Sequence, residues 1–237
     1  MRAIYMNQQR GIHLNQSKYR WDRTESPASY ALRYICSLRR FLIAGLACEN
    51  ATDQILENLI QSLVSNGYEE KTPGRFRDYL ISRIKQQTED HLSNQDLTTG
   101  SAKINEWINE ALQPQSLLWM RTWRDSLLER SWRSLEKSEH VDPEMPVHSV
   151  LHASSAQPNN NLAMISVQVA TSQGVKIPEE RVGEILAEAK IQFAQILADE
   201  ICETLSVDSL DSIQEEIQLL GLSRAFDGIR VFPKSTN

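Results

Sequence analysis

Three histidines have the type and spacing that could support metal chemistry. His148 and His152 stand four positions apart, and His140 lies nearby. A structural zinc site needs four ligands drawn from cysteine, histidine and carboxylate side chains. The surrounding residues 140–161 are marked by prolines and asparagines and hold no cysteine and no carboxylate cluster. We therefore expect these histidines to lie in a solvated loop, with no metal bound.

Catalytic motifs are missing from the chain. It has no Gly-x-x-x-x-Gly-Lys phosphate loop, no Gly-x-Gly-x-x-Gly fingerprint and no Gly-x-Ser-x-Gly nucleophile turn. The acidic pairs Glu179-Glu180 and Glu215-Glu216 are typical of helix surfaces. The first pair also suits a helix N-terminus, where the helix dipole attracts negative charge. We expect no enzymatic activity and no cofactor.

The chain is acidic overall but begins with a basic segment. Its 237 residues include 25 Lys and Arg against 31 Asp and Glu, a net charge of −6, while residues 1–40 hold eight basic and two acidic side chains. An acidic surface is repelled by backbone phosphates, so DNA binding across the whole molecule is not expected, although a basic patch can act locally. Nine glycines and eight prolines leave little material for the turns of an all-β protein.

Cysteine usage and hydropathy favour the cytoplasm. The three cysteines, Cys36, Cys48 and Cys202, have no metal-ligand spacing, and the first two fall on apolar helical stretches. We expect them to be buried free thiols. The polar N-terminus has no signal core, and the longest apolar run, residues 41–48, is too short to cross a bilayer. A soluble cytoplasmic protein with no membrane partner is predicted.

Hydrophobic periodicity predicts an all-α fold. Residues 27–48, 51–64 and 75–92 each carry apolar side chains at three- and four-residue steps. Three helices of this length can close a small bundle. The side chains expected to form its core are Leu38, Leu42, Ile55, Leu59, Leu63, Phe76, Leu80 and Ile84.

The helical pattern continues in the second half. A short helix should end before Pro114, and a helix over residues 115–138 carries tryptophans and leucines on one side, which we assign to core packing rather than to base stacking. Residues 140–161 hold three prolines and are expected to be a linker. A short helix, a turn at Gly174 and a longer helix from Pro178 then follow in the order of a helix-turn-helix.

A distinctive motif occupies residues 74–81, which are Gly-Arg-Phe-Arg-Asp-Tyr-Leu-Ile. A glycine turn and two arginines around a phenylalanine precede an apolar helical run. With residues 19–21, 123–132, 193–205 and 209–220, in this order, the motif resembles sigma factors of the extracytoplasmic-function (ECF) type. The resemblance is strongest to the divergent group abundant in planctomycetes.

The resemblance implies a function in promoter recognition and transcription initiation, with RNA polymerase core and promoter DNA as partners. The helix over residues 51–64 would dock on the polymerase clamp, with Asp53 and Glu57 toward basic residues there. The alternative is that it serves only as an amphipathic helix of the bundle. An anti-sigma or other regulatory protein is a further partner that the resemblance allows. The implied DNA-binding residues are Arg75, Arg77, Arg83 and Lys85 in the first domain and Arg181, Lys190 and Gln192 in the second.

The chain departs from the family at its DNA-binding positions. Residues 90–96 are not basic where the family carries arginines and lysines, and residues 162–205 hold three basic against seven acidic side chains. Each missing phosphate contact lowers the affinity for DNA, so promoter binding is weakened. Two functions stay open: a divergent ECF-like sigma factor, or a degenerate sigma-like protein without DNA binding that acts as a protein-interaction or regulatory module.

The predicted organisation is two small helical domains, a sigma region-two-like bundle and a helix-turn-helix-like region four, joined by a helical connector and a linker. The boundaries are 1–26 for a basic N-terminal segment, 27–97 for the first domain, 98–139 for the connector, 140–161 for the linker, 162–205 for the second domain and 206–237 for an acidic C-terminal helix and tail.

Overall fold

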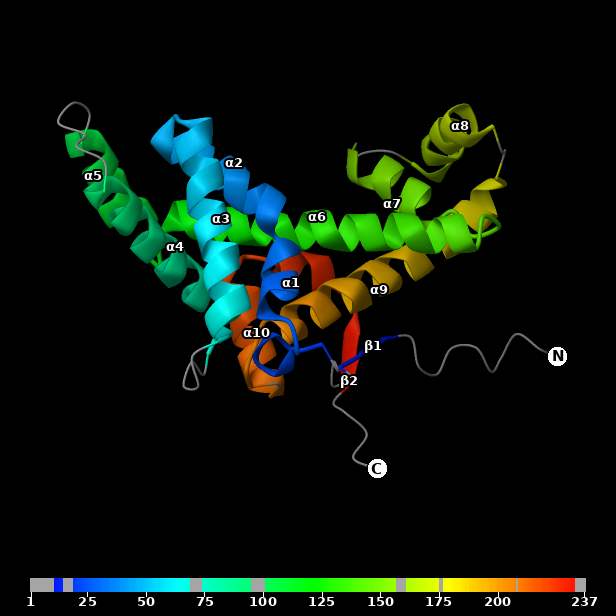
Figure 1. Cartoon of the computed structure of the whole chain (residues 1–237). Helices are drawn as coiled ribbons and strands as arrows, with labels where there is room; N and C mark the ends of the chain where they lie inside the picture. Colours follow the sequence, from blue (N-terminus) through cyan, green and yellow to red (C-terminus); the bar gives the residue numbers. More distant parts are fainter. Residues whose placement is uncertain are drawn as a thin grey trace. The chain divides into compact units, whose positions relative to one another are not determined.

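The computed structural model describes residues 11–14, 19–68, 74–94, 101–156, 161–174, 177–207 and 209–232. Within these ranges the chain is mostly helical, with ten α-helices, two 3₁₀ turns and two strands of three residues each (Figure 1). The predicted all-α class is confirmed at this level. None of the helices described is long and apolar enough to cross a membrane.

The chain divides into two compact units, and the boundary falls inside two of its helices. Unit 1 holds residues 1–15, 127–200 and 222–237, and unit 2 holds residues 16–126 and 201–221. Helix α6 (Leu117–Val141) and helix α9 (Glu179–Glu203) each contribute to both units. The units are described separately below.

Unit 2 contains the predicted three-helix bundle. Helix α3 packs against α1, α2 and α4, and all eight side chains expected in the core are buried. The bundle is therefore confirmed. The elements of the unit, besides its parts of α6 and α9, are η1 (Trp21–Arg23), α1 (Pro27–Leu32), α2 (Ile35–Leu46), α3 (Glu49–Asn66), α4 (Phe76–Ser93), α5 (Ser101–Ala111) and α10 (Leu210–Leu219).

The single helix expected over residues 27–48 is wrong, because the chain breaks into α1 and α2 at Arg33 and Tyr34. Tyr34 has ψ near 0°, and its buried ring lies 4.6 Å from that of Trp123, centroid to centroid. Packing of this ring sets the direction of the chain at the break. The phase of the apolar face changes there, so that Leu32, expected inside, is 47% exposed.

The cysteine expectation is wrong for two of the three thiols. Cys36 and Cys48 are exposed, and only Cys202 is buried. Cys36 lies in the first turn of α2, just after the break, on the side that faces solvent. Cys48 has extended backbone between α2 and α3, after Ala47 ends α2 in the left-handed conformation with φ 50°. Both positions lie outside the packed helix face on which the expectation rested.

Aromatic rings fill the core of unit 2. Phe76 is fully buried and contacts the rings of Trp21, Tyr30 and Trp123 at centroid distances of 5.5, 4.9 and 6.0 Å. Trp119 and Trp123 are buried on α6. The assignment of the tryptophan stripe to core packing is confirmed for these two residues. Trp132, in the unit 1 part of α6, is half-buried.

Unit 1 contains helices α7 (Val147–Ala156) and α8 (Leu162–Gln173), the parallel strands β1 (Gly11–His13) and β2 (Arg230–Phe232), and the 3₁₀ turn η2 (Ser223–Phe226). The linker expected over residues 140–161 is wrong where α7 occupies it. Pro146 directly precedes this helix, a position that proline tolerates. Glu139 accepts hydrogen bonds from the backbone N and the Oγ of Ser149 at 2.8 and 2.7 Å, which fixes the first turn.

The order of helix, glycine turn and longer helix is present in unit 1. Asn161 caps α8 by accepting a hydrogen bond from the backbone N of Met164 at 2.9 Å. Gly174 ends α8 with φ 72°, a left-handed conformation that suits glycine. Helix α9 then begins at Glu179, directly after Pro178. These ends agree with the sequence prediction.

Candidate interaction surfaces

The Gly74–Arg77 segment is tied by its backbone to the residues that follow α9. The backbone N of Phe76 donates to the carbonyl of Thr204 at 2.8 Å, and that of Ser206 donates to the carbonyl of Gly74 at 2.9 Å. The backbone N of Gly74 donates to Ser206 Oγ at 2.5 Å. Gly74 has φ 137°, which a residue with a Cβ adopts only under strain. These hydrogen bonds hold the start of α4 in place through the backbone, independently of the side chains of Arg75 and Arg77.

Arg77 forms a buried bidentate ion pair with α10. Its Nε and Nη2 lie 2.7 and 3.2 Å from the two carboxylate oxygens of Glu216, and both side chains are 1% exposed. Its Nη1 also donates to Asp78 Oδ1 at 2.6 Å and to the carbonyl of Pro114 at 3.2 Å. Burial raises the pKa of Asp78, against the opposing effect of Arg77. The guanidinium has no face toward solvent.

Arg75 completes the arginine–glutamate cluster, which we define as Arg75, Arg77, Glu215 and Glu216. Its Nε lies 2.7 Å from Glu216 Oε2, and its Nη2 lies 2.8 Å from Glu215 Oε1. Glu216 therefore holds both arginines. The expectation that Glu215-Glu216 lies on a helix surface is wrong for Glu216, which is fully buried.

The other two predicted DNA-binding residues of the first domain lie further along α4. The Arg83 guanidinium carbon lies 5.6 Å from the centroid of the Tyr79 ring, and its Nη1 donates to Gln86 at 3.1 Å. The Lys85 ammonium lies 3.9 Å from Glu89. Both side chains are partly exposed. Three of the four predicted residues thus lie on α4 and Arg75 directly precedes it, but only Arg77 is withdrawn completely from solvent.

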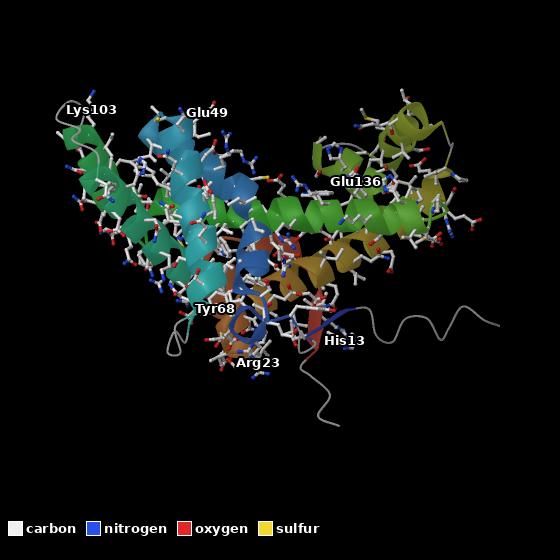
Figure 2. The ribbon with its side chains drawn as sticks, in the orientation of Figure 1. His13, Arg23, Glu49, Tyr68, Lys103 and Glu136 are labelled. Atoms are coloured by element: carbon white, nitrogen blue, oxygen red, sulfur yellow. The ribbon has the colours of Figure 1, made fainter. Side chains whose placement is uncertain are left out.

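The predicted polymerase-binding pair lies on an exposed polar face of α3. We call this the α3 polar face and define it as Glu49, Asn50, Asp53, Gln54, Glu57, Asn58 and Gln61, all of them exposed. Figure 2 shows the Glu49 side chain at the start of the helix. Glu57 accepts a hydrogen bond from Gln61 at 3.2 Å.

Arg39 of α2 partly neutralises the α3 polar face. Its Nε and Nη2 donate to the two carboxylate oxygens of Asp53 at 2.7 and 3.1 Å, and Nη2 also lies 3.1 Å from Glu49. The hydrogen bond from Arg39 lowers the pKa of Asp53 below its usual range. The Arg39 and Asp53 side chains remain 40% and 54% exposed. Both ends of this pair are therefore accessible to a partner.

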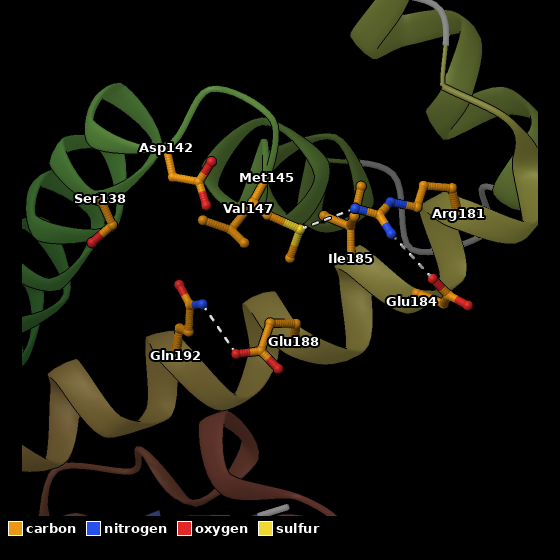
Figure 3. A pocket seen from close by; sticks show the side chains of 9 residues that line it. All are labelled: Ser138, Asp142, Met145, Val147, Arg181, Glu184, Ile185, Glu188 and Gln192. Atoms are coloured by element: carbon orange, nitrogen blue, oxygen red, sulfur yellow. Dashed lines mark hydrogen bonds and ion pairs between the residues drawn. The ribbon is translucent and has the colours of Figure 1, made fainter. Parts of the chain in front are cut away.

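The predicted DNA-binding residues of the second domain lie on α9. Arg181 contacts Glu184 at 3.6 Å and Met145 Sδ at 3.5 Å, and Gln192 donates to Glu188 at 3.0 Å. Lys190 is exposed. Arg181 and Gln192 line an open groove of unit 1 (Figure 3), whereas Lys190 does not. Each of the two groove residues already has an acidic neighbour on its own helix.

The expectation of a solvated loop is wrong for the three histidines, which lie on two helices: His140 is in the last turn of α6, and the other two are on α7. His148 and His152 are on α7, where their ring centroids lie 5.7 and 6.1 Å from the Trp132 ring. In the part of the chain that the structure describes, no group of three or more His, Cys, Asp or Glu side chains could hold a metal ion. Because α7 was not predicted from the sequence, the packing of these histidines against Trp132 was not predicted either.

The arginine–glutamate cluster is the feature that sequence reasoning missed, although a signal for it exists. Glu216 lies three residues after Ile213 and four before Leu220, and both of these are buried. A carboxylate on the apolar side of a helix predicts a buried cationic partner. Which arginine provides it could not be predicted, because Arg77 lies 139 positions away in the sequence.

Comparison with known proteins adds no identity to these surfaces. No family model, no curated protein sequence and no solved structure matches the chain.

Proposed function

We propose that this chain is a sigma-like protein-interaction module that docks on RNA polymerase core through the α3 polar face and does not hold DNA. One observation carries the choice between the two candidate functions. Arg75 and Arg77, which a sigma factor of this type would use for DNA, are paired with Glu215 and Glu216 inside unit 2. The acidic residues expected to meet polymerase are exposed.

The energetic argument concerns what DNA binding would require. A phosphate could reach Arg77 only if the guanidinium left Glu216, which would leave a buried carboxylate without its partner. Breaking a buried pair in this way costs roughly 3–5 kcal/mol. A single exposed phosphate contact gains much less than this, since non-specific binding is the sum of many such contacts. The predicted DNA-binding residues of the second domain lie among acidic side chains of α9, such as Glu184 and Glu188, which repel backbone phosphates.

Binding of a partner at the α3 polar face would not require a buried ion pair to break. Arg39 and Asp53 are exposed, and exposed ion pairs contribute little to stability. A basic partner surface can therefore attract Asp53 and Glu57 without unfolding any part of the unit. Complementary charge of this kind raises the association rate and fixes orientation.

The test is co-purification with RNA polymerase core. We expect the charge reversal Asp53→Lys with Glu57→Lys to weaken capture of core roughly tenfold or more, because like charges then face each other. The matched control is Glu106→Lys with Glu110→Lys on α5, where two exposed glutamates have the same spacing. Equal capture by both double variants would exclude the α3 polar face as the contact.

The divergent sigma factor remains the second candidate, because Arg83 and Lys85 are partly exposed on α4. In vitro transcription with core polymerase on promoter fragments distinguishes the two. Core binding without specific initiation supports the interaction module. Specific initiation that depends on this chain would refute the proposed absence of DNA binding.

A further inference from the structure

Arg39 of α2 contacts two of the three acidic side chains on the α3 polar face. Its Nε and Nη2 donate to the two carboxylate oxygens of Asp53 at 2.7 and 3.1 Å, so the guanidinium binds this carboxylate through both of its oxygens. Nη2 also donates to Glu49 Oε2 at 3.1 Å. An arginine of the same chain therefore lies where a basic side chain of a partner would have to bind.

The third acidic side chain of the α3 polar face has a neutral neighbour. Glu57 accepts a hydrogen bond from the amide of Gln61 at 3.2 Å. It lies about one helical turn after Asp53 and is exposed in the same way. One carboxylate of this surface is thus paired with an arginine and another with an amide. Comparing the two isolates the effect of Arg39.

The Arg39–Asp53 pair can open without any movement of the backbone. Its side chains are 40% and 54% exposed, so water can replace either partner. Only Ala47 and Cys48 separate α2 from α3, and the two helices pack against each other. Arg39 therefore stays near Asp53 after the pair opens. It acts as a tethered ligand with a high effective concentration.

The fold does not need this pair to join α2 to α3. An exposed ion pair adds little to stability. The two helices are already held together by buried side chains from both of them, which are Leu38, Leu42, Ile55 and Leu59. The effect of Arg39 is therefore expected on binding rather than on folding.

We propose that Arg39 is an intramolecular competitor at the α3 polar face, which must release Asp53 and Glu49 before a basic side chain of the partner can bind them. The inference rests on the proposed function, because it concerns the same surface and the same partner, polymerase core. The partner binds only those molecules in which the pair is open, so the apparent affinity is reduced by their fraction. For an exposed pair this reduction is about two- to six-fold.

The experiment measures the dissociation constant of the full chain for polymerase core at low ionic strength, where exposed charges are least screened. We expect Arg39→Gln to bind core about two- to six-fold more tightly than wild type. The matched control is Arg40→Gln, which removes the same charge from the next position of α2, where the guanidinium donates to Ser37 Oγ at 3.2 Å. This control should bind core as wild type does. Circular dichroism checks that both variants fold.

Double-mutant cycles assign the gain to Asp53. In an Asp53→Asn background, Arg39→Gln should improve binding less than it does in wild type, because the carboxylate for which Arg39 competes is gone. In a Glu57→Gln background, which removes the same charge about one turn further along α3, the improvement should equal that in wild type. Equal improvement in all three backgrounds would show that Arg39 acts only through overall charge, and would overturn the proposal.

Failure of the competition and failure of the proposed function give different results. If Asp53→Lys with Glu57→Lys weakens core binding while Arg39→Gln binds no better than Arg40→Gln, the polymerase contact stands and the competition is overturned. If neither wild type nor Arg39→Gln binds core, both are overturned.

One further measurement needs no partner. Because Arg39 lowers the pKa of Asp53, the ¹³C resonance of the Asp53 carboxyl group should titrate at a higher pH in Arg39→Gln than in wild type. The midpoint in Arg40→Gln should equal that of wild type. Equal midpoints in wild type and Arg39→Gln would show that the pair does not form in solution, which would overturn the proposal whatever core does.

Discussion

Unit 2 contains two arginine–carboxylate pairs of the same chemistry in opposite environments. Arg77 and Glu216 are each 1% exposed and share two contacts, of 2.7 and 3.2 Å. Arg39 and Asp53 are 40% and 54% exposed and also share two, of 2.7 and 3.1 Å. The geometry of the two pairs is nearly identical. Burial is the difference between them.

Burial decides what each pair can do. In the interior, an ion that loses its partner cannot be hydrated, so the buried pair holds α10 on α4 and resists exchange. At the surface, water and salt replace either partner at little cost. An arginine–carboxylate pair therefore stabilises the fold where it is buried, at Arg77 and Glu216. Where it is exposed, at Arg39, its two side chains can still bind a partner.

The largest effect is expected at the buried pair. Glu216→Ala should lower the free energy of unfolding by roughly 3–5 kcal/mol, because Arg77 is left buried and only partly paired. Urea denaturation followed by circular dichroism measures this. A loss below about 1 kcal/mol, the range of exposed pairs, would remove the distinction between the two environments.

A double replacement sharpens the same comparison. Arg77→Met with Glu216→Leu removes both charges and keeps apolar volume, so the double variant should recover most of the stability lost in Glu216→Ala. With the single variants Arg77→Met and Glu216→Leu added, a double-mutant cycle gives the coupling energy, which separates an unpaired buried charge from simple loss of packing. If the double variant is as unstable as Glu216→Ala, the charge is not the cause.

The helices of the bundle could be predicted because their signal is local. The spacing of Leu38, Leu42, Ile55 and Leu59 within each helix requires no knowledge of the partner helix, and all four are buried as expected. Helix ends that are set by a single residue, such as Gly174 at the end of α8, could also be predicted from the sequence.

Features that depend on distant partners could not be predicted. The break at Tyr34 follows from packing against Trp123, and β1 pairs with β2 across almost the whole sequence. Strands of three residues are too short to show an alternating pattern. The predicted DNA-binding site of the first domain was wrong at Arg77 for the same reason. Its burial depends on Glu216 of α10, which is distant in the sequence.

An intermediate effect is expected at Asp78, next to the buried pair. Burial raises its pKa, so the folded state binds its proton more tightly than the unfolded state does. Stability must then rise as the pH falls from neutral through this raised pKa, relative to a variant that cannot titrate. The measurement compares urea midpoints of wild type and Asp78→Asn between about pH 7 and pH 3. Parallel midpoint curves would show that the folded and unfolded pKa values are equal.

The smallest effect is expected at Asp53. Arg39 lowers its pKa, so the sign is opposite to that of Asp78: the contribution is present above the unfolded pKa and lost as the pH falls through the lower folded pKa. Because the pair is exposed, we expect Asp53→Asn to leave the urea midpoint at neutral pH unchanged within error. Any excess stability of wild type should begin to decline below about pH 4, be lost below the lower folded pKa, and shrink in high salt.

The Asp53→Asn variant also links stability to recognition. If Asp53 serves a partner and not the fold, the substitution should weaken capture of polymerase core while its denaturation curve overlays that of wild type. A clear loss of stability at neutral pH would instead place the Arg39–Asp53 pair with the buried pair, as a structural contact. The α3 polar face would then have to bind through Glu57 and its neutral neighbours, and the contrast between the two environments would no longer separate structure from function.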